Sequence, residues 1–94
     1  MNDVPLDTDT PELAPTFRFQ WEEAQNCWVI LYPEGMVKLS PSAGEIMKRC
    51  DGKSNVEQIV SSLEAQYSAT GLSADIRKFL ETAREHGWIR YRAE

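Results

Sequence analysis

The stretch that decides the fold is residues 17–39, FRFQWEEAQNCWVILYPEGMVKL. Its first five residues alternate aromatic and polar side chains, which is the pattern of a strand with one apolar face. Residues 27–32 are β-branched and aromatic, as is typical of a central strand. Pro33 and Gly35 suit the second and fourth positions of a type I turn, and residues 36–39 make a third, short strand. The stretch therefore predicts a three-stranded antiparallel meander.

The chain after this stretch has helical periodicity. Ser40 stands before a proline, which places a capping residue ahead of the first helical position. Ser54 and Glu57 have the spacing of a capping box in front of a second helix, and Ser73 is placed to cap a third. Residues 88–91 alternate briefly, which allows a last short strand. We therefore expect an α+β fold that is winged helix-turn-helix-like, with a three-stranded antiparallel sheet followed by three helices.

Residues 1–15 differ in composition from the rest. They contain three prolines and four acidic residues, with no Lys or Arg. We expect a disordered, acidic, Pro-containing tail over residues 1–15 and one domain over residues 16–94. The tail is either solvated chain without a specific role or a segment that shields the binding site. Since the net charge is −5 and most of it lies in this tail, the body is close to neutral, which argues against a nucleic-acid partner.

Targeting and membrane signals are not evident in the sequence. No N-terminal basic flank precedes an apolar run, and the longest apolar run, residues 27–32, is too short to cross a bilayer. We expect a cytoplasmic protein with no membrane partner. Cys27 and Cys50 fall in different predicted elements, and we expect both to be free, buried, structural thiols rather than a bridge or a ligand pair.

The residue inventory does not favour catalysis. The single histidine, His86, falls at the end of a predicted helix, where a cation is stabilising. His, Cys and carboxylate residues do not cluster at metal-ligand spacing, and the glycines are scattered singly. We therefore predict that the chain is not an enzyme and needs no cofactor or metal.

A DNA-binding or regulatory winged-helix module is the alternative function. The third helix would then be the recognition helix. Its polar positions balance three bases against three acids, which is a poor match to phosphate. These positions are Asp75, Arg77, Lys78, Glu81, Arg84 and Glu85.

The third strand is the more specific clue to function. In a meander it lies at an edge of the sheet and leaves backbone N–H and C=O groups unpaired. Only Lys38 interrupts its apolar residues Met36, Val37 and Leu39. An extended peptide could add to this edge as a further strand. Alternatively, the edge is covered by the protein's own tail or by a helix.

Residues 31–40, LYPEGMVKLS, followed by residues 42–46, SAGEI, and residues 50–52, CDG, resemble the PqqD family of pyrroloquinoline quinone biosynthesis. The similarity extends from about residue 17 to the closing Gly-Trp-Ile at residues 87–89. It implies a peptide chaperone that binds the ribosomal precursor peptide PqqA and presents it to the radical S-adenosylmethionine enzyme PqqE.

The resemblance also implies a site, in which the precursor lies as an added strand between the third strand and the third helix. The strand wall would be Met36, Val37, Lys38 and Leu39. The helix wall would be Ile76, Phe79, Leu80, Ala83 and Arg84. Because Phe79 and Leu80 are adjacent on a helix, we expect one to pack in the core and the other to border the groove. The protein would be a monomer or a homodimer, and a purely structural subunit without a peptide site is a third possibility.

Overall fold

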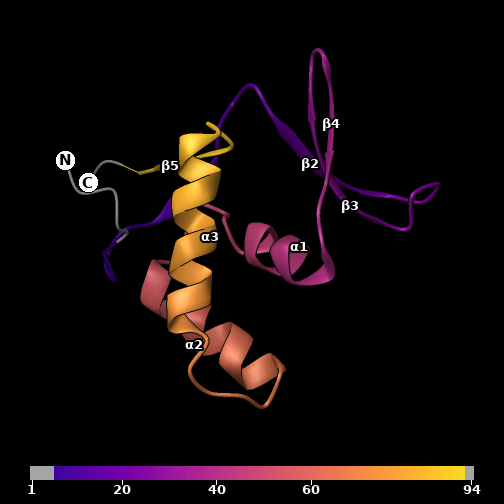
Figure 1. Cartoon of the computed structure of the whole chain (residues 1–94). Helices are drawn as coiled ribbons and strands as arrows, with labels where there is room; N and C mark the ends of the chain where they lie inside the picture. The colour runs from indigo at the N-terminus through magenta and orange to yellow at the C-terminus, as the bar shows by residue number, and fades with distance from the viewer. Residues whose placement is uncertain (1–5, 93–94) are drawn as a thin grey trace.

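A computed structural model describes residues 6–92 (Figure 1). Its elements, in chain order, are β1 (Pro11–Leu13), β2 (Arg18–Glu22), β3 (Cys27–Tyr32), β4 (Gly35–Lys38), α1 (Pro41–Lys48), α2 (Val56–Gln66), α3 (Ser73–Glu85) and β5 (Ile89–Tyr91). The three strands and three helices expected from the sequence are confirmed.

Strands β2, β3 and β4 form an antiparallel sheet with β3 in the centre. Ile30 lies in register with Phe19 on one side and Val37 on the other, so these three side chains share one face of the sheet. On that face the ring of Phe19 stacks on that of Trp28, with centroids 4.5 Å apart. This face carries the aromatic residues of β2 and β3, which explains the alternation in the sequence.

The helices pack against the apolar face of this sheet, and α1 makes the contact with β3. Figure 1 shows α3 crossing in front of α2, with α1 between α3 and the strands. Ile30 from the sheet, Ile59 from α2 and Leu80 from α3 are all fully buried in one core. Leu39, in the link between β4 and α1, is buried in the same core.

The helix caps follow the sequence prediction only in part. Ser40 caps α1, because its side chain accepts from the backbone N–H of Ala43. The capping box of α2 is formed by Asn55 and Gln58, one residue later than predicted. Ser54 is not the cap, because the side chain of Asn55 accepts from the backbone N–H of Gln58, and the N–H of Ser54 donates to the carboxylate of Asp51 in the preceding turn.

The cap predicted for the third helix is also different. Helix α3 begins at Ser73, so Leu72 is in the cap position and provides no side-chain cap. The hydroxyl of Ser73 instead accepts from Nε of Arg77 one turn later.

The N-terminal segment differs from the disordered tail that its composition predicts. Pro11 is fully buried, and β1 pairs antiparallel with β5, whose presence confirms the final strand allowed by the sequence. The carbonyls of Asp7 and Asp9 accept from the first two N–H groups of α2. We call residues 6–13 the strap. Residues 1–5 of the predicted tail lie outside the described residues.

Three further expectations concern membranes, cysteines and metals. Within residues 6–92, no helix has the length and apolar character needed to cross a membrane. Cys27 and Cys50 are free cysteines, and Cys50 is buried as expected, whereas Cys27 is only half-buried. In the same part of the chain, His, Cys, Asp and Glu side chains form no group of three that could hold a metal ion.

Candidate functional site

Strand β4 is one of the two edges of the sheet, the other being β2. The β2 edge carries charged residues at both of its ends, Arg18 and Glu22, which is a common way to protect an edge from pairing. Strand β4 has a single charged residue, Lys38, and leads into α1 through Leu39 and Ser40. The β4 edge is therefore the more open of the two.

The register shows which backbone groups of β4 face outward. The N–H of Leu39 donates to the carbonyl of Trp28, so Leu39 faces β3. In an antiparallel ladder the direction of the backbone groups alternates along the strand. Val37 therefore also faces β3, opposite Ile30, while Met36 and Lys38 direct their N–H and C=O groups away from the sheet. Among residues 6–92, no other strand pairs with this outer side.

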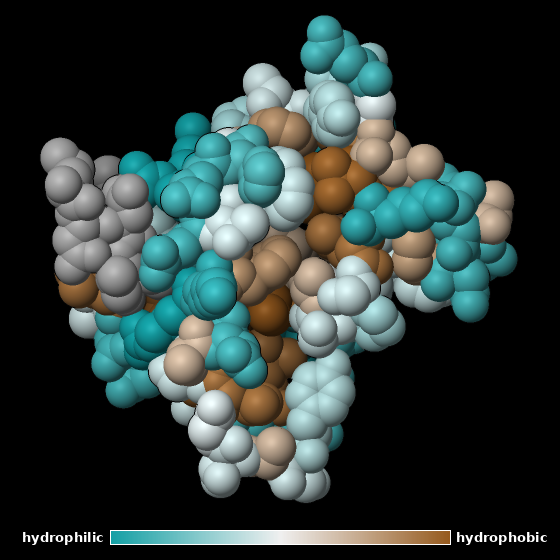
Figure 2. All heavy atoms as spheres, viewed as in Figure 1, coloured by the Kyte–Doolittle hydropathy of each residue, from teal (hydrophilic) through white to brown (hydrophobic). Residues whose placement is uncertain are grey.

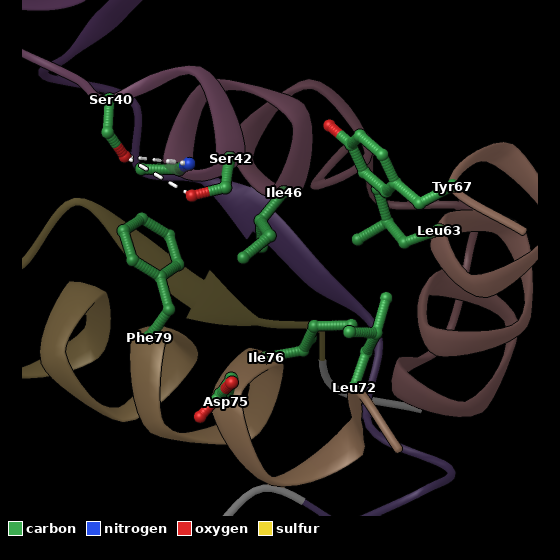
Figure 3. Close-up of a pocket in the computed structure, with 10 residues that line it drawn as sticks. Ser40, Ser42, Ile46, Leu63, Tyr67, Leu72, Asp75, Ile76 and Phe79 are labelled. Carbon is green, nitrogen blue, oxygen red and sulfur yellow. Dashed lines mark hydrogen bonds between the residues drawn. The ribbon is translucent and has the colours of Figure 1, made fainter. Parts of the chain in front are cut away.

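A cleft opens where β4 ends and lies between the three helices. Its volume is about 390 Å³, and apolar residues make up most of its wall. Figure 3 shows Phe79 of α3 pointing across the cleft towards Ser40, with Ile46 of α1 facing Ile76 of α3. The lining consists of Ser40, Ser42, Ala43, Ile46, Leu63, Tyr67, Leu72, Asp75, Ile76 and Phe79. The edge and the cleft are thus adjacent through Ser40.

The surface around this cleft is apolar in character. Figure 2 shows hydrophobic residues in a hollow that runs from the lower centre, over the helices, towards the strands at upper right. Hydrophilic residues lie on both sides of the hollow. An apolar floor bordered by polar residues is the usual composition of a groove that binds an extended chain.

The four residues expected on the strand wall have different exposures. Met36 and Lys38 are exposed, and Val37 is half-buried and packs against the core. Leu39 is buried in the core and offers its side chain to no guest. The backbone of Met36 and Lys38, with the side chain of Val37, is what β4 presents at its edge.

The helix wall divides in a similar way. Ile76 and Phe79 line the cleft, whereas Leu80 and Ala83 are fully buried in the core. The division expected between Phe79 and Leu80 is thus present, with Phe79 at the cleft. Leu80 and Ala83 can support the wall but do not form its surface.

Arg84 lies away from the cleft. It is five residues beyond Phe79, which places the two about 140° apart around the helix axis. Its guanidinium lies over the ring of Tyr91 in β5, 5.6 Å from the ring centroid. Burial raises the pKa of Tyr91 to about 12. Arg84, which the family resemblance assigned to the groove, therefore packs on the opposite flank of α3.

Several lining residues were absent from the sequence-based site. Ile46, Leu63 and Tyr67 follow helical spacing, and such a stripe indicates a core position and a cleft wall equally well. Only the arrangement of the three helices in space decides whether such a residue lies in the core or in the wall of the cleft. Asp75, which was expected only as a polar position of the third helix, also lines the cleft (Figure 3).

A second, smaller cleft lies on the other side of α1. Its volume is about 180 Å³, and Trp21, Trp28, Pro41 and Tyr67 are in its wall. Glu45 also lines it, and a hydrogen bond from Arg49 at 2.9 Å lowers the pKa of this carboxyl group. Tyr67 belongs to both clefts.

Comparison with known proteins gives a consistent result. The family described as "Coenzyme PQQ synthesis protein D (PqqD)" matches residues 27–89. A protein of Methylococcus capsulatus (strain Bath), named "PqqA binding protein", is 52% identical over 84% of this chain and 85% of its own length. A protein of Stutzerimonas stutzeri with the same name is 48% identical over 98% of this chain and 100% of its own.

Two solved structures are similar in fold. The solution structure of the PqqD part of PqqCD from Methylobacterium extorquens superposes with a TM-score of 0.78 at 28% identity, covering 96% of this chain and 99% of that one. Its description calls it a stand-alone recognition element for ribosomally synthesised, post-translationally modified peptides. The crystal structure of PqqD from Xanthomonas campestris gives a TM-score of 0.56 at 29% identity, over 83% and 89% of the two chains.

Proposed function

The chain belongs to the PqqD family of coenzyme PQQ synthesis proteins, and from that premise we propose that it is a peptide chaperone. It binds the precursor peptide PqqA by strand addition along β4 and presents it to the radical S-adenosylmethionine enzyme PqqE. The relatives named for PqqA binding support PqqA as the ligand. Presentation to PqqE rests on the resemblance of the sequence to the family.

One observation supports strand addition most directly. The outward N–H and C=O groups of Met36 and Lys38 have no strand beside them among residues 6–92, and they lead to the apolar cleft at Ser40. Backbone pairing provides affinity that depends little on sequence, and the cleft provides a place for side chains. An edge and a cleft in this order suit a disordered precursor that becomes extended when it binds.

The side chains of the domain support a role in binding without chemistry. Burial raises the pKa of the Cys50 thiol to about 12, so this cysteine is a poor nucleophile. His86 stacks on Trp88 at the end of α3, with ring centroids 4.7 Å apart, and does not line either of the two clefts. We therefore propose that the enzyme performs all the chemistry and that this domain holds and delivers its substrate.

The test of strand addition is a proline at Met36. Because the N–H of Met36 faces outward, Met36→Pro removes a donor for the guest while sparing the ladder with β3. We expect the affinity for PqqA, measured by calorimetry, to fall by about tenfold or more, as the loss of one hydrogen bond and the obstruction of the edge by the proline ring imply. Unchanged affinity would rule out pairing at this edge.

Two matched variants accompany that measurement. Met36→Ala removes the side chain but keeps the N–H, so it should bind PqqA within about threefold of the parent chain. Val37→Pro should instead unfold the sheet, because the N–H of Val37 faces β3. Amide spectra of all three variants distinguish a blocked edge from a lost fold.

Delivery is tested separately from binding. Crosslinking of PqqA by PqqE would be assayed with the parent chain, with the Met36→Pro variant and with no chaperone added. Of these three reactions, all of which contain PqqE, we expect crosslinked product only in the one with the parent chain. Equal product without any chaperone, or crosslinked peptide formed by this chain in the absence of the enzyme, would contradict the proposed division of labour.

A further inference from the structure

The register of β4 determines how a guest strand must present its side chains. In an added guest strand, one residue stands directly opposite Met36 and another directly opposite Lys38. Their side chains point to the same face as Met36 and Lys38, which is the face away from the helices. The guest residues opposite Val37 and Leu39 point to the other face, towards the helices.

The face towards the helices accepts apolar side chains. Val37 is half-buried against the core, and Leu39 is 93% buried, since its exposed fraction is 7%. The guest residue opposite Leu39 lies beside Ser40, where the cleft begins and where Phe79 points (Figure 3). One bulky apolar side chain of the guest therefore enters the cleft, and a second packs over Val37 two residues away.

The guest residue between these two has its side chain on the outer face of the sheet, where a different kind of side chain is favoured. Lys38 is exposed, and none of the ion pairs found among residues 6–92 involves it. Across the sheet from Lys38 stand Val29 and then Gln20, so its row holds no carboxylate. A guest residue opposite Lys38 would supply the missing opposite charge, and cross-strand pairs of this kind favour pairing.

We infer that the domain reads a tripeptide of the pattern apolar–acidic–apolar, in which the central carboxylate pairs with Lys38 and the outer two side chains face the helices. This inference rests on the proposed strand addition along β4. Because the pattern is symmetric, it holds for a guest strand that runs parallel or antiparallel to β4. Lys38 is then a specificity-determining residue for the peptide.

The experiment is a charge swap followed by calorimetry with PqqA and the full chain. Lys38→Glu should weaken binding about threefold to tenfold, because it replaces an opposite-charge pair with a like-charge pair. Lys53→Glu is the control, since Lys53 is exposed in the loop after α1 and its replacement changes the net charge equally. It should leave the affinity within about twofold.

The complementary change of charge is then made in the peptide. Each acidic residue of PqqA is replaced in turn by Lys, and each variant is titrated into both chains. One replacement should restore binding to the Lys38→Glu chain while weakening binding to the parent, and apolar residues should stand on both sides of it. An equal loss for Lys38→Glu and Lys53→Glu, or rescue at an acid without apolar neighbours, overturns the inference.

The outcome separates this inference from the proposal on which it rests. If Met36→Pro abolishes binding and Lys38→Glu has no specific effect, the peptide adds to β4 but is not read by charge. If Met36→Pro has no effect, strand addition at this edge fails, and the tripeptide pattern fails with it.

Discussion

Gly44 lies where α1 crosses β3, and its lack of a side chain sets the distance between them. A Cβ atom at this position would lie 2.7 Å from Cδ1 of Trp28 and 3.1 Å from its Cβ. Trp28 is not free to yield, because it stacks on Phe19 and meets Trp21 edge-on at 5.6 Å. The close approach of α1 therefore depends on one residue, Gly44.

We predict that Gly44→Ala destabilises the domain in spite of the better helix propensity of alanine. Propensity would favour the change by about 1 kcal/mol, but overpacking against Trp28, which stacking holds in place, should cost about 3 kcal/mol, the upper end of the usual range. The net loss of about 2 kcal/mol is measurable by urea unfolding. Ser61→Ala, on an exposed turn of α2, is the control and should raise the free energy of unfolding slightly. A Gly44→Ala protein as stable as the parent would contradict the close contact.

At the same scale, the sequence predicts which side chains belong to an apolar face better than it predicts which backbone groups point outward. The alternation of β2 was enough to place Phe19 on an apolar face, whereas the continuous run of β3 identified a central strand without showing which face Ile30 occupies. For Val37 and Met36 the question is which backbone N–H faces outward. That depends on the ladder with β3, whose register follows from the turn at Pro33 and Glu34 and is not visible in β4 itself.

At the scale of elements, the strap joins parts of the chain that lie far apart in sequence. Its carbonyls cap α2, the carboxylate of Asp7 pairs with Arg77 of α3, and Glu12 pairs with Arg90 of β5 at 2.8 Å. Composition predicted disorder here because prolines and acidic residues have little apolar surface to bury. The strap is ordered because its backbone groups find partners in other elements, and three-residue strands carry no periodic pattern that could reveal this.

We predict that a chain lacking residues 1–10 is less stable but still binds PqqA. Loss of the carbonyls of Asp7 and Asp9 exposes two N–H groups of α2, and the free energy of unfolding should fall by roughly 1–2 kcal/mol. Urea unfolding measures this loss, and calorimetry with PqqA should give an affinity within about twofold of the parent. Tighter binding by the shortened chain would show instead that the segment shields the groove.

The two cysteines report on the opening of the whole molecule. Cys50 is in the shared core, its Sγ donates to the carbonyl of Ile46, and burial raises its pKa to about 12. At pH 8 the thiolate fraction of such a group is about one part in ten thousand. Cys27, at the start of β3, is only half-buried. The two thiols therefore differ in their access to solvent.

We predict that a disulfide reagent labels the native protein in two phases at pH 8. One equivalent should react rapidly at Cys27, and the second should react slowly at Cys50, at a rate that urea accelerates as it does global unfolding. A Cys27→Ser chain should lose the rapid phase alone. Labelling of both thiols in a single rapid phase would mean that the core around α1 opens without unfolding.

Because β1 pairs with β5, the described chain begins and finishes on the same side of the molecule. The N–H of Arg92 donates to the carbonyl of Thr10, and Figure 1 places this meeting point across α3 from the β2–β3–β4 sheet. A fluorophore, a resin or a second protein attached at Leu6 or Arg92 would lie across α3 from the β2–β3–β4 sheet. Immobilised or fused copies should thus keep the β4 rim open for capture, which makes this fold a practical scaffold for displaying designed peptides to an enzyme.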